Sequence, residues 1–419
     1  MQYLREFLAG QLNLALTGVF FSEDWDFGPN RFLNDGAGEV KIQENTELLF
    51  RANGSLGESP TFEIGDRVFI GIPPRIGMVN QAANFFGTCG GYLVAGRTSD
   101  WKVRERLGLE GGVSEIQASL GWLAFQRLRT APKATEQACA YAIINRELMP
   151  AEFLESFADR TSIADDDLGT CELVFSVSHT ENSKIEYAML LKDEEVWVRV
   201  RTEQAFEENI LWHRDALLDT LSFLWGDSLR PLAMFTRLST AEITELPAKL
   251  SSLSKNRCLL APITVRAGNG QDPIQLIRET TDFFLCDGFK MIRHLKAWWS
   301  AKVCYPEIQA AALVLTLENI ASDSAIGQSN LVQELATISE IELTAGSNQG
   351  LMQEIESFET TRQLSRSIDS EFLAQEIGHL YVLIRFLYQV TLSRIGYTGQ
   401  LSYPNMLVWQ RGNDQPAVQ

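Results

Sequence analysis

The segment TTRQLSRSID, residues 360–369, carries the side chains best suited to chemistry on a phosphate. Arg362 and Arg366 are four residues apart, so on a helix they share one face. Two neighbouring guanidinium groups can hold a phosphate through paired hydrogen bonds. Glu359 and Asp369 are close enough in the sequence to neutralise the same arginines. The local pattern therefore allows a phosphate site or a surface cluster of ion pairs, and by itself it favours the ion pairs.

A second cationic segment is KMIRHLKAWWSAK, residues 290–302. A basic helix beside aromatic side chains can contact RNA phosphates and stack a base. The same composition is typical of an amphipathic helix whose tryptophans anchor it in a core, and the sequence favours this second interpretation. The candidate RNA contacts are Lys290, Arg293, His294, Lys296, Trp298 and Lys302.

The chain offers little support for metal or cofactor chemistry. It has four histidines, widely spaced, and six cysteines, no two at the CxxC spacing of a zinc site. There is no GxxxxGK[ST] phosphate loop, no HExxH and no GxSxG motif. The acidic run ADDDLG, residues 164–169, lacks the spacing of a calcium loop, and we interpret it as a solvated loop. We expect neither a metal nor a cofactor.

Composition points to a folded protein without a membrane segment. Of 419 residues, 45% are apolar, enough for two or three packed domains. The formal net charge of −18 disfavours non-specific binding of nucleic acid by the whole surface. The N-terminus has polar interruptions that a signal peptide lacks, and the most apolar later run, residues 377–392, is too short to span a bilayer. We expect a soluble cytoplasmic protein with reduced thiols.

Residues 1–270 read mainly as strands. CELVFSVSH (171–179) alternates as a strand does, and KIEYAMLL with VWVRVR flanks KDEE as a hairpin with a four-residue loop. Two helices are predicted within this part, at 134–148 and at 208–226, where Gly226 is the expected stop.

After a boundary at the glycine-rich residues 266–275, almost every segment reads as helix. The helix over 370–396 is apolar nearly all round, which is typical of the centre of a bundle or of a dimer interface. The predicted fold class is α+β, with a β-rich N-terminal domain (1–270), an all-α helical bundle (275–412) and a loose tail (413–419).

This layout resembles the ApeA-type abortive-infection proteins of bacterial anti-phage defence, which have a β-rich N-terminal domain followed by a helical HEPN domain. Three segments carry the resemblance. LLDTLSFLWGDSLRPLAMFTR (217–237) is similar to the helix and strand that close the family's first domain. TTRQLSRSID stands where the family has its Arg-Asn-x-x-x-His element, and EIGHLYVLIRFLYQVTLSRIGYTG (376–399) is similar to the closing helix.

The resemblance implies a metal-independent endoribonuclease architecture, with a cleft formed by two protomers. Arg362 would stabilise the charged phosphorane, and Gln363 would take the place of the asparagine. The family's histidine, which moves the proton, is replaced by Ser367, a group too weakly basic for that role. Loss of a general base commonly costs a factor of about 100 to 10,000 in rate. His379 or His294 would have to supply the imidazole instead.

Two functions therefore stand as expectations. The first is an RNA-directed defence protein whose degenerate HEPN module keeps its shape, its dimer surface and RNA binding, so whether it is an enzyme stays open. The second is a non-catalytic binding or scaffold subunit of a larger complex, whose β-rich domain supplies the recognition surface. A third, less favoured hypothesis is a ligand-binding β-domain with an oligomerising bundle. The expected partners are RNA, a second copy or a protein complex.

Overall fold

The structure is a computed structural model. It describes residues 2–22, 31–42, 47–55, 61–64, 67–70, 76–79, 83–105, 113–129, 136–146, 157, 160–179, 182, 184–193, 195–226, 228–247, 272–286, 292–296, 315–317, 319, 387–388 and 390–396.

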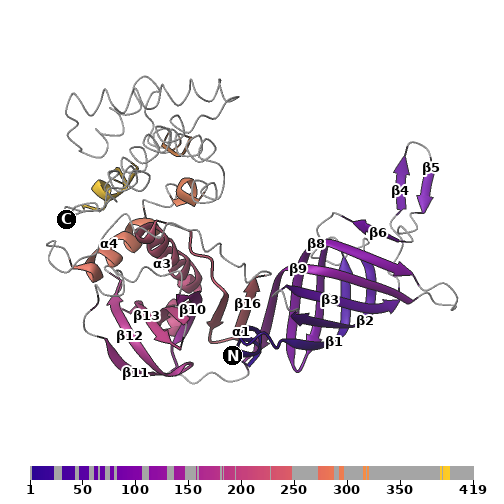
Figure 1. Cartoon of the computed structure of the whole chain (residues 1–419), viewed down its shortest axis with the longest axis horizontal. Helices are drawn as coiled ribbons and strands as arrows, with labels where there is room; N and C mark the ends of the chain where they lie inside the picture. Colours follow the sequence, from indigo (N-terminus) through magenta and orange to yellow (C-terminus); the bar gives the residue numbers. More distant parts are fainter. Residues whose placement is uncertain are drawn as a thin grey trace, which may run out of the picture.

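The first third of the chain forms a closed antiparallel barrel of six strands (Figure 1). Its interior is filled by aromatic rings: Phe50 and Phe85 stack with centroids 4.2 Å apart, and Phe21 stacks on Phe50 at 5.8 Å. A six-stranded barrel is narrow enough for side chains to fill it, which makes this one a packed core. The strands, in order around the barrel, are β9 (Val113–Leu128), β3 (Leu48–Ser55), β2 (Arg31–Ile42), β1 (Asn13–Ser22), β7 (Ala83–Cys89) and β8 (Tyr92–Glu105), which pairs with β9.

Three smaller elements attach to the barrel. Helix α1 (Gln2–Leu8) buries Leu4 and Phe7 against it. Strand β6 (Ile76–Val79) extends the sheet beside β8, and the hairpin of β4 (Thr61–Ile64) with β5 (Arg67–Ile70) projects away from it (Figure 1).

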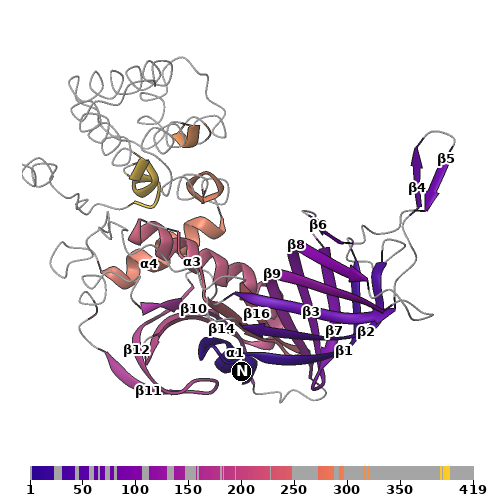
Figure 2. The ribbon, with the colours of Figure 1, turned by 45° about the vertical axis from the view of Figure 1, so that its right-hand side comes forward.

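A second antiparallel sheet continues from the barrel through the long strand β9. Residues 113–119 of β9 pair with β3, whereas residues 122–128 pair with β16, so one strand belongs to both sheets. The two sheets meet along this strand, with the N-terminus near their junction (Figure 2). The order from β9 outward is β16 (Ala241–Pro247), β15 (Ala233–Arg237), β10 (Ala138–Asn145), β14 (Glu195–Thr202), β13 (Glu186–Lys192), β12 (Gly169–Ser178) and β11 (Thr161–Asp165).

Helices cover one face of the second sheet (Figures 1 and 2). A 3-10 turn, η2 (Gln204–Asn209), leads into α3 (Ile210–Trp225), which lies across β10 and β14 and ends at Gly226 with φ 74°, a left-handed conformation that suits glycine. Helix α4 (Pro273–Leu285) starts with Asp272 as its N-cap and packs on α3 and β12. The helix predicted at 208–226, with Gly226 as its stop, is thereby confirmed.

The predicted all-α C-terminal bundle is wrong for the residues that the structure describes. There the last third contains α4 and short helical stretches, while the described region as a whole is dominated by strands. Their buried side chains do not form a core of their own: Leu276, Leu295 and Tyr388 belong to the same hydrophobic cluster as Val198 of β14 and Leu221 of α3. The Tyr388 hydroxyl donates to the backbone oxygen of Phe223, and its ring stacks on the Phe223 ring.

Two further predictions are corrected and one is confirmed. The helix predicted at 134–148 is strand β10, buried on both faces in the middle of the second sheet. A strand buried on both sides has no polar positions to mark its period, which is why its pattern passed for a helix. The strand at 171–179 is confirmed as β12. The next hairpin is present, but Lys192 pairs with Glu195, so its turn holds two residues, with Asp193 at φ 54°.

Candidate functional site

Most residues of the sequence-predicted site lie outside the described residues. These are Arg362, Arg366, Ser367, His379, Lys290, Trp298 and Lys302. Arg293, His294 and Lys296 belong to the described turn 292–296, where Lys296 Nζ lies 2.7 Å from Asp219 Oδ2 of α3. Ile292 and Leu295 of that turn are buried, as the amphipathic interpretation of the segment requires.

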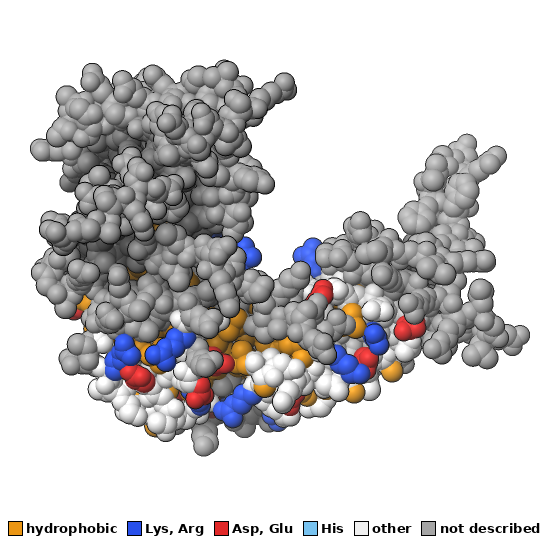
Figure 3. Space-filling model, viewed as in Figure 1, with side chains coloured by type: hydrophobic (Ala, Val, Ile, Leu, Met, Phe, Trp, Pro, Cys, Tyr) orange, Lys and Arg blue, Asp and Glu red, His pale blue; other side chains and the backbone are white. Residues whose placement is uncertain are grey.

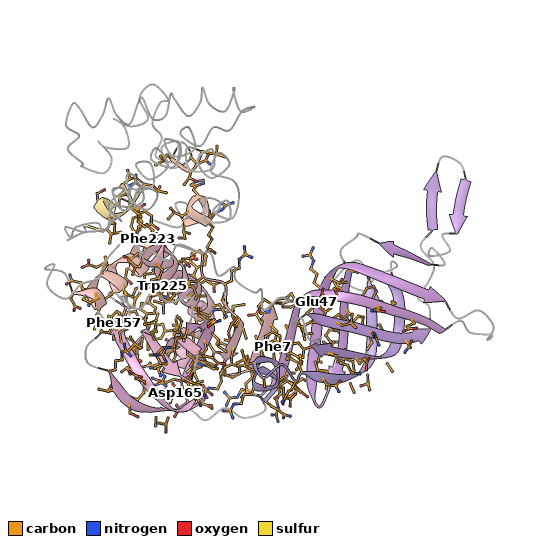
Figure 4. All side chains as sticks on the ribbon, viewed as in Figure 1. Phe7, Glu47, Phe157, Asp165, Phe223 and Trp225 are labelled. Carbon is orange, nitrogen blue, oxygen red and sulfur yellow. The ribbon has the colours of Figure 1, made fainter. Side chains whose placement is uncertain are left out.

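A cluster of arginines lies on the face of the second sheet that α3 does not cover. The valines of β14 point to α3, so the alternation of a strand sends Arg199 and Arg201 to the opposite side. Tyr141 of β10 and Arg237 of β15 share that face with them. In Figure 4, Asp165, which binds these arginines, lies across the sheet from Trp225 of α3.

The acidic run ADDDLG supplies the counter-charges, and its interpretation as a solvated loop was wrong for two of its three aspartates. Asp165 Oδ2 lies 2.6 Å from Arg199 and 3.3 Å from Arg201, and its side chain is completely buried. Asp165 Oδ1 accepts hydrogen bonds from Tyr141 and from the backbone N–H groups of Asp167 and Leu168. Burial raises the pKa of Asp165, but the Arg199 and backbone hydrogen bonds outweigh it and hold the pKa below its ordinary value.

The remaining charged side chains of the cluster also form ion pairs with one another. Arg199 reaches Glu186 at 2.5 Å, Arg237 reaches Asp167 at 2.5 Å and Glu136 at 3.5 Å, and Arg129 lies 2.6 Å from Glu136. The four cations are matched by five carboxylates, because Glu242 also lies 3.9 Å from Arg129. They are Arg129, Arg199, Arg201, Arg237, Glu136, Asp165, Asp167, Glu186 and Glu242. An internally paired cluster with no excess of positive charge fastens strands together rather than leaving a cation for a substrate.

A second cluster of titratable side chains lies on the other face of the second sheet, between the sheet and the helices α3 and α4. His179 follows β12, Tyr187 is in β13, His213 is in α3 and Asp282 is in α4. The two imidazole rings meet edge to face with centroids 5.3 Å apart, and both are nearly buried. Sequence inspection found the histidines far apart, and folding brings this pair together.

A backbone hydrogen bond fixes which ring nitrogen of His179 carries the proton. The backbone N–H of Asn182 donates to Nδ1 of His179 at 3.0 Å, so the proton is on Nε2, which lies 3.2 Å from Asp282 Oδ1. Nδ1 of His213 lies 2.8 Å from the Tyr187 hydroxyl, and the tautomer of His213 decides which of the two groups donates. Burial raises the pKa of Tyr187, so the phenol keeps its proton. Burial, with a smaller effect of His179, lowers the pKa of His213 to about 4.

This arrangement resembles the orientation of a catalytic histidine by a carboxylate but lacks its essential feature. A general base needs a free nitrogen directed at the substrate. In both rings Nδ1 already takes part in a hydrogen bond with the protein. The pair therefore connects the sheet to α3 and α4.

A third feature is a set of exposed apolar side chains, Leu211 and Trp212 at the start of α3 and Leu128 at the end of β9, called here the Trp212 surface. These side chains are 65%, 38% and 46% exposed. Cross-strand pairing puts Leu128 on the same side of the sheet as Glu245, whose Oε2 is 3.7 Å from Arg214 of α3.

Two hydrogen bonds connect the end of β9 to β16 and the loop before β16 to the turn before α3. Arg129, next to Leu128, donates its N–H to the oxygen of Thr240, and Ser239 donates its N–H to Glu207, just before α3. Figure 3 shows hydrophobic side chains in the middle of one face of the molecule, over the junction of the two sheets, among mixed charges.

Among the described residues, no set of three histidine, cysteine or carboxylate side chains is grouped to bind a metal. No helix in the same part of the chain has the length and hydropathy to cross a bilayer. Comparisons with protein-family models, with curated proteins and with solved structures returned no match.

Proposed function

We propose that the chain is a non-catalytic binding protein, acting in the cytoplasm as a subunit or scaffold of a protein complex. One observation carries the proposal: the residue types that could do chemistry in the described region are used to hold the fold together. The arginines and carboxylates neutralise one another, and Nδ1 of both histidines of the pair is hydrogen-bonded within the protein. What the region presents to a partner is its surface.

The Trp212 surface is the part of that surface best suited to a protein partner. Trp212 is 46% exposed, and tryptophan is among the residues that contribute most to interfaces. A net charge of −18 favours a partner with a positive surface, because complementary charge accelerates encounter.

A binding experiment in the native host tests the proposal. The full-length tagged chain should co-purify with a partner in fixed stoichiometry, and Trp212→Ala together with Leu128→Ala should reduce partner affinity at least tenfold, since loss of an interface tryptophan costs about 2 kcal/mol or more. Lys41→Ala, an exposed change on the barrel, serves as the matched control and should leave the partner bound. Equal retention of the partner by both variants would remove the Trp212 surface from the proposal.

The RNA-directed defence function remains a prediction, since Arg362 and Ser367 lie outside the described residues. Incubation of the purified chain with total RNA and a chelator separates it from the binding role. Cyclic-phosphate products that disappear in Arg362→Ala would show that the protein is a nuclease and would refute the non-catalytic proposal. Intact RNA beside a stoichiometric protein partner is the outcome that we expect.

A further inference from the structure

The two histidines sit where the helix layer meets the sheet, and each makes its contact through Nδ1. His179 holds the β12–β13 connection closed, because its Nδ1 accepts from Asn182 while its backbone N–H donates to Ile185. His213 connects α3 to β13 through Tyr187. His179 also reaches α4 through Asp282.

We propose that His179 and His213 form an acid-sensitive clasp, in which charging both rings places two positive charges beside one carboxylate in a nearly buried site and so favours separation of α3 and α4 from the β12–β13 hairpin. The reason is geometric. A protonated imidazole has N–H groups on both nitrogens and no acceptor. A proton on Nδ1 of His179 would therefore oppose the N–H of Asn182, whereas a charged His213 would donate to the Tyr187 oxygen and bring a second positive ring to 5.3 Å from the first.

The surroundings offer little compensation for two positive rings. The groups that face His213 are Tyr187 from β13, His179 from the end of β12, and Asp282 with Cys286 from α4 and its end. On α3 itself, the adjacent Arg214 is paired with Asp215 and Glu245. Asp282 is thus the carboxylate shared by both rings, and two imidazoliums beside one carboxylate leave a net positive charge in a nearly buried site.

The size of the effect follows from the linkage between protonation and opening. The pKa of His213 is lowered from 6.5 to about 4 in the closed state. A lowered histidine pKa means that the closed state is fully stable above about pH 6.5 and loses stability as the pH falls towards 4. If opening restores the ordinary value, the open state is favoured about thirtyfold more at pH 5 than at pH 8.

Hydrogen exchange of the full-length chain, corrected for the intrinsic effect of pH, measures this opening. Peptides that cover 179–187 and 276–286 should exchange about thirtyfold faster at pH 5 than at pH 8, whereas β7 of the barrel should not. In His179→Asn/His213→Asn the asparagine oxygen can replace the Nδ1 acceptor without titrating, so the difference should vanish. The control variant His294→Asn, which lies outside the clasp, should keep the difference in exchange rate between pH 5 and pH 8.

The same acceleration in the double asparagine variant as in the wild type would overturn the proposal. A second measurement does not depend on the folding of that variant. In wild-type protein with ¹⁵N-labelled histidine, the His213 ring should be neutral at pH 7.5 and should become charged only well below its ordinary pKa of 6.5, near pH 4. Single variants His179→Asn and His213→Asn assign the two signals. Titration of His213 at its ordinary pKa would also refute the clasp.

Discussion

The triplet Asp165–Asp166–Asp167 offers a direct test of the arginine cluster, because three identical neighbours occupy three different environments. Asp165 is completely buried between Arg199 and Arg201, whereas Asp166 is exposed. Removing one partner of a buried ion pair costs about 3–5 kcal/mol, since the other charge is left without compensation. Asp165→Asn should therefore lower the free energy of unfolding by about 3–5 kcal/mol, and Asp166→Asn by less than about 0.5 kcal/mol.

Asp167 gives a third and different expectation. Burial raises the pKa of Asp167 and the charge of Arg237 lowers it, with burial the stronger effect. Since the folded protein disfavours this charge on balance, Asp167→Asn should cost much less than Asp165→Asn, about 1 kcal/mol or less.

Equilibrium urea unfolding, followed by tryptophan fluorescence and far-UV circular dichroism, measures all three variants, with equal m-values showing that the same surface is exposed on unfolding. The pH supplies a second check. The folded pKa of Asp165 is lowered, so its stabilisation is present above the unfolded value of 3.8 and is lost as the pH falls through the folded value. The gap between wild type and Asp165→Asn should therefore close in strong acid. Equal, near-zero costs for all three aspartates would refute this account and support a solvated loop.

Two further predictions concern the barrel and α3. A Cβ on Gly96 would lie 2.1 Å from the buried Phe85 ring, so Gly96→Ala should destabilise the barrel by about 1–3 kcal/mol in thermal unfolding, while Gly121→Ala, with its nearest atom at 3.5 Å, should cost clearly less. Burial raises the pKa of Asp219 to about 6 despite its pairing with Lys296, so Asp219→Asn should stabilise the protein by about 1–3 kcal/mol at pH 7.5, a gain that shrinks as the pH falls from 6 towards 4. A loss of stability in Asp219→Asn at pH 7.5 would contradict this second prediction.

The helices and strands that could be predicted from the sequence are those in which apolar and polar residues alternate with a visible period. Helix α3 has polar positions between its buried leucines and a glycine stop, and the β13–β14 hairpin has a polar turn between apolar strands. Strand β10 has neither, because both of its faces are buried. The C-terminal helices show another limit: an amphipathic pattern tells that a face is buried but not against what, and α4 packs on α3 and β12.

The site was harder to predict because its partners are distant in the chain. The alternation in VWVRVR was a usable signal, since a strand with valines on one face must put Arg199 and Arg201 together on the other. A buried and a half-buried arginine side by side require carboxylates, and the strand order brings the ADDDLG turn of the outer hairpin to that face. No comparable signal marks the pair of His179 and His213, which only the packing of α3 brings within 5.3 Å.

The first turn of α3 connects the two proposals. Trp212, the exposed aromatic residue, directly precedes His213, whose ring is fixed to Tyr187. Adjacent helix residues point in directions about 100° apart, so one faces solvent while the next faces the sheet. A proton on His213 that favours opening of the clasp also loosens the turn that positions Trp212. Because coupling between two binding events is reciprocal, a partner bound at the Trp212 surface should in turn lower the affinity of His213 for its proton. The partner's affinity should therefore fall at pH 5 in the wild type and stay constant in His213→Asn.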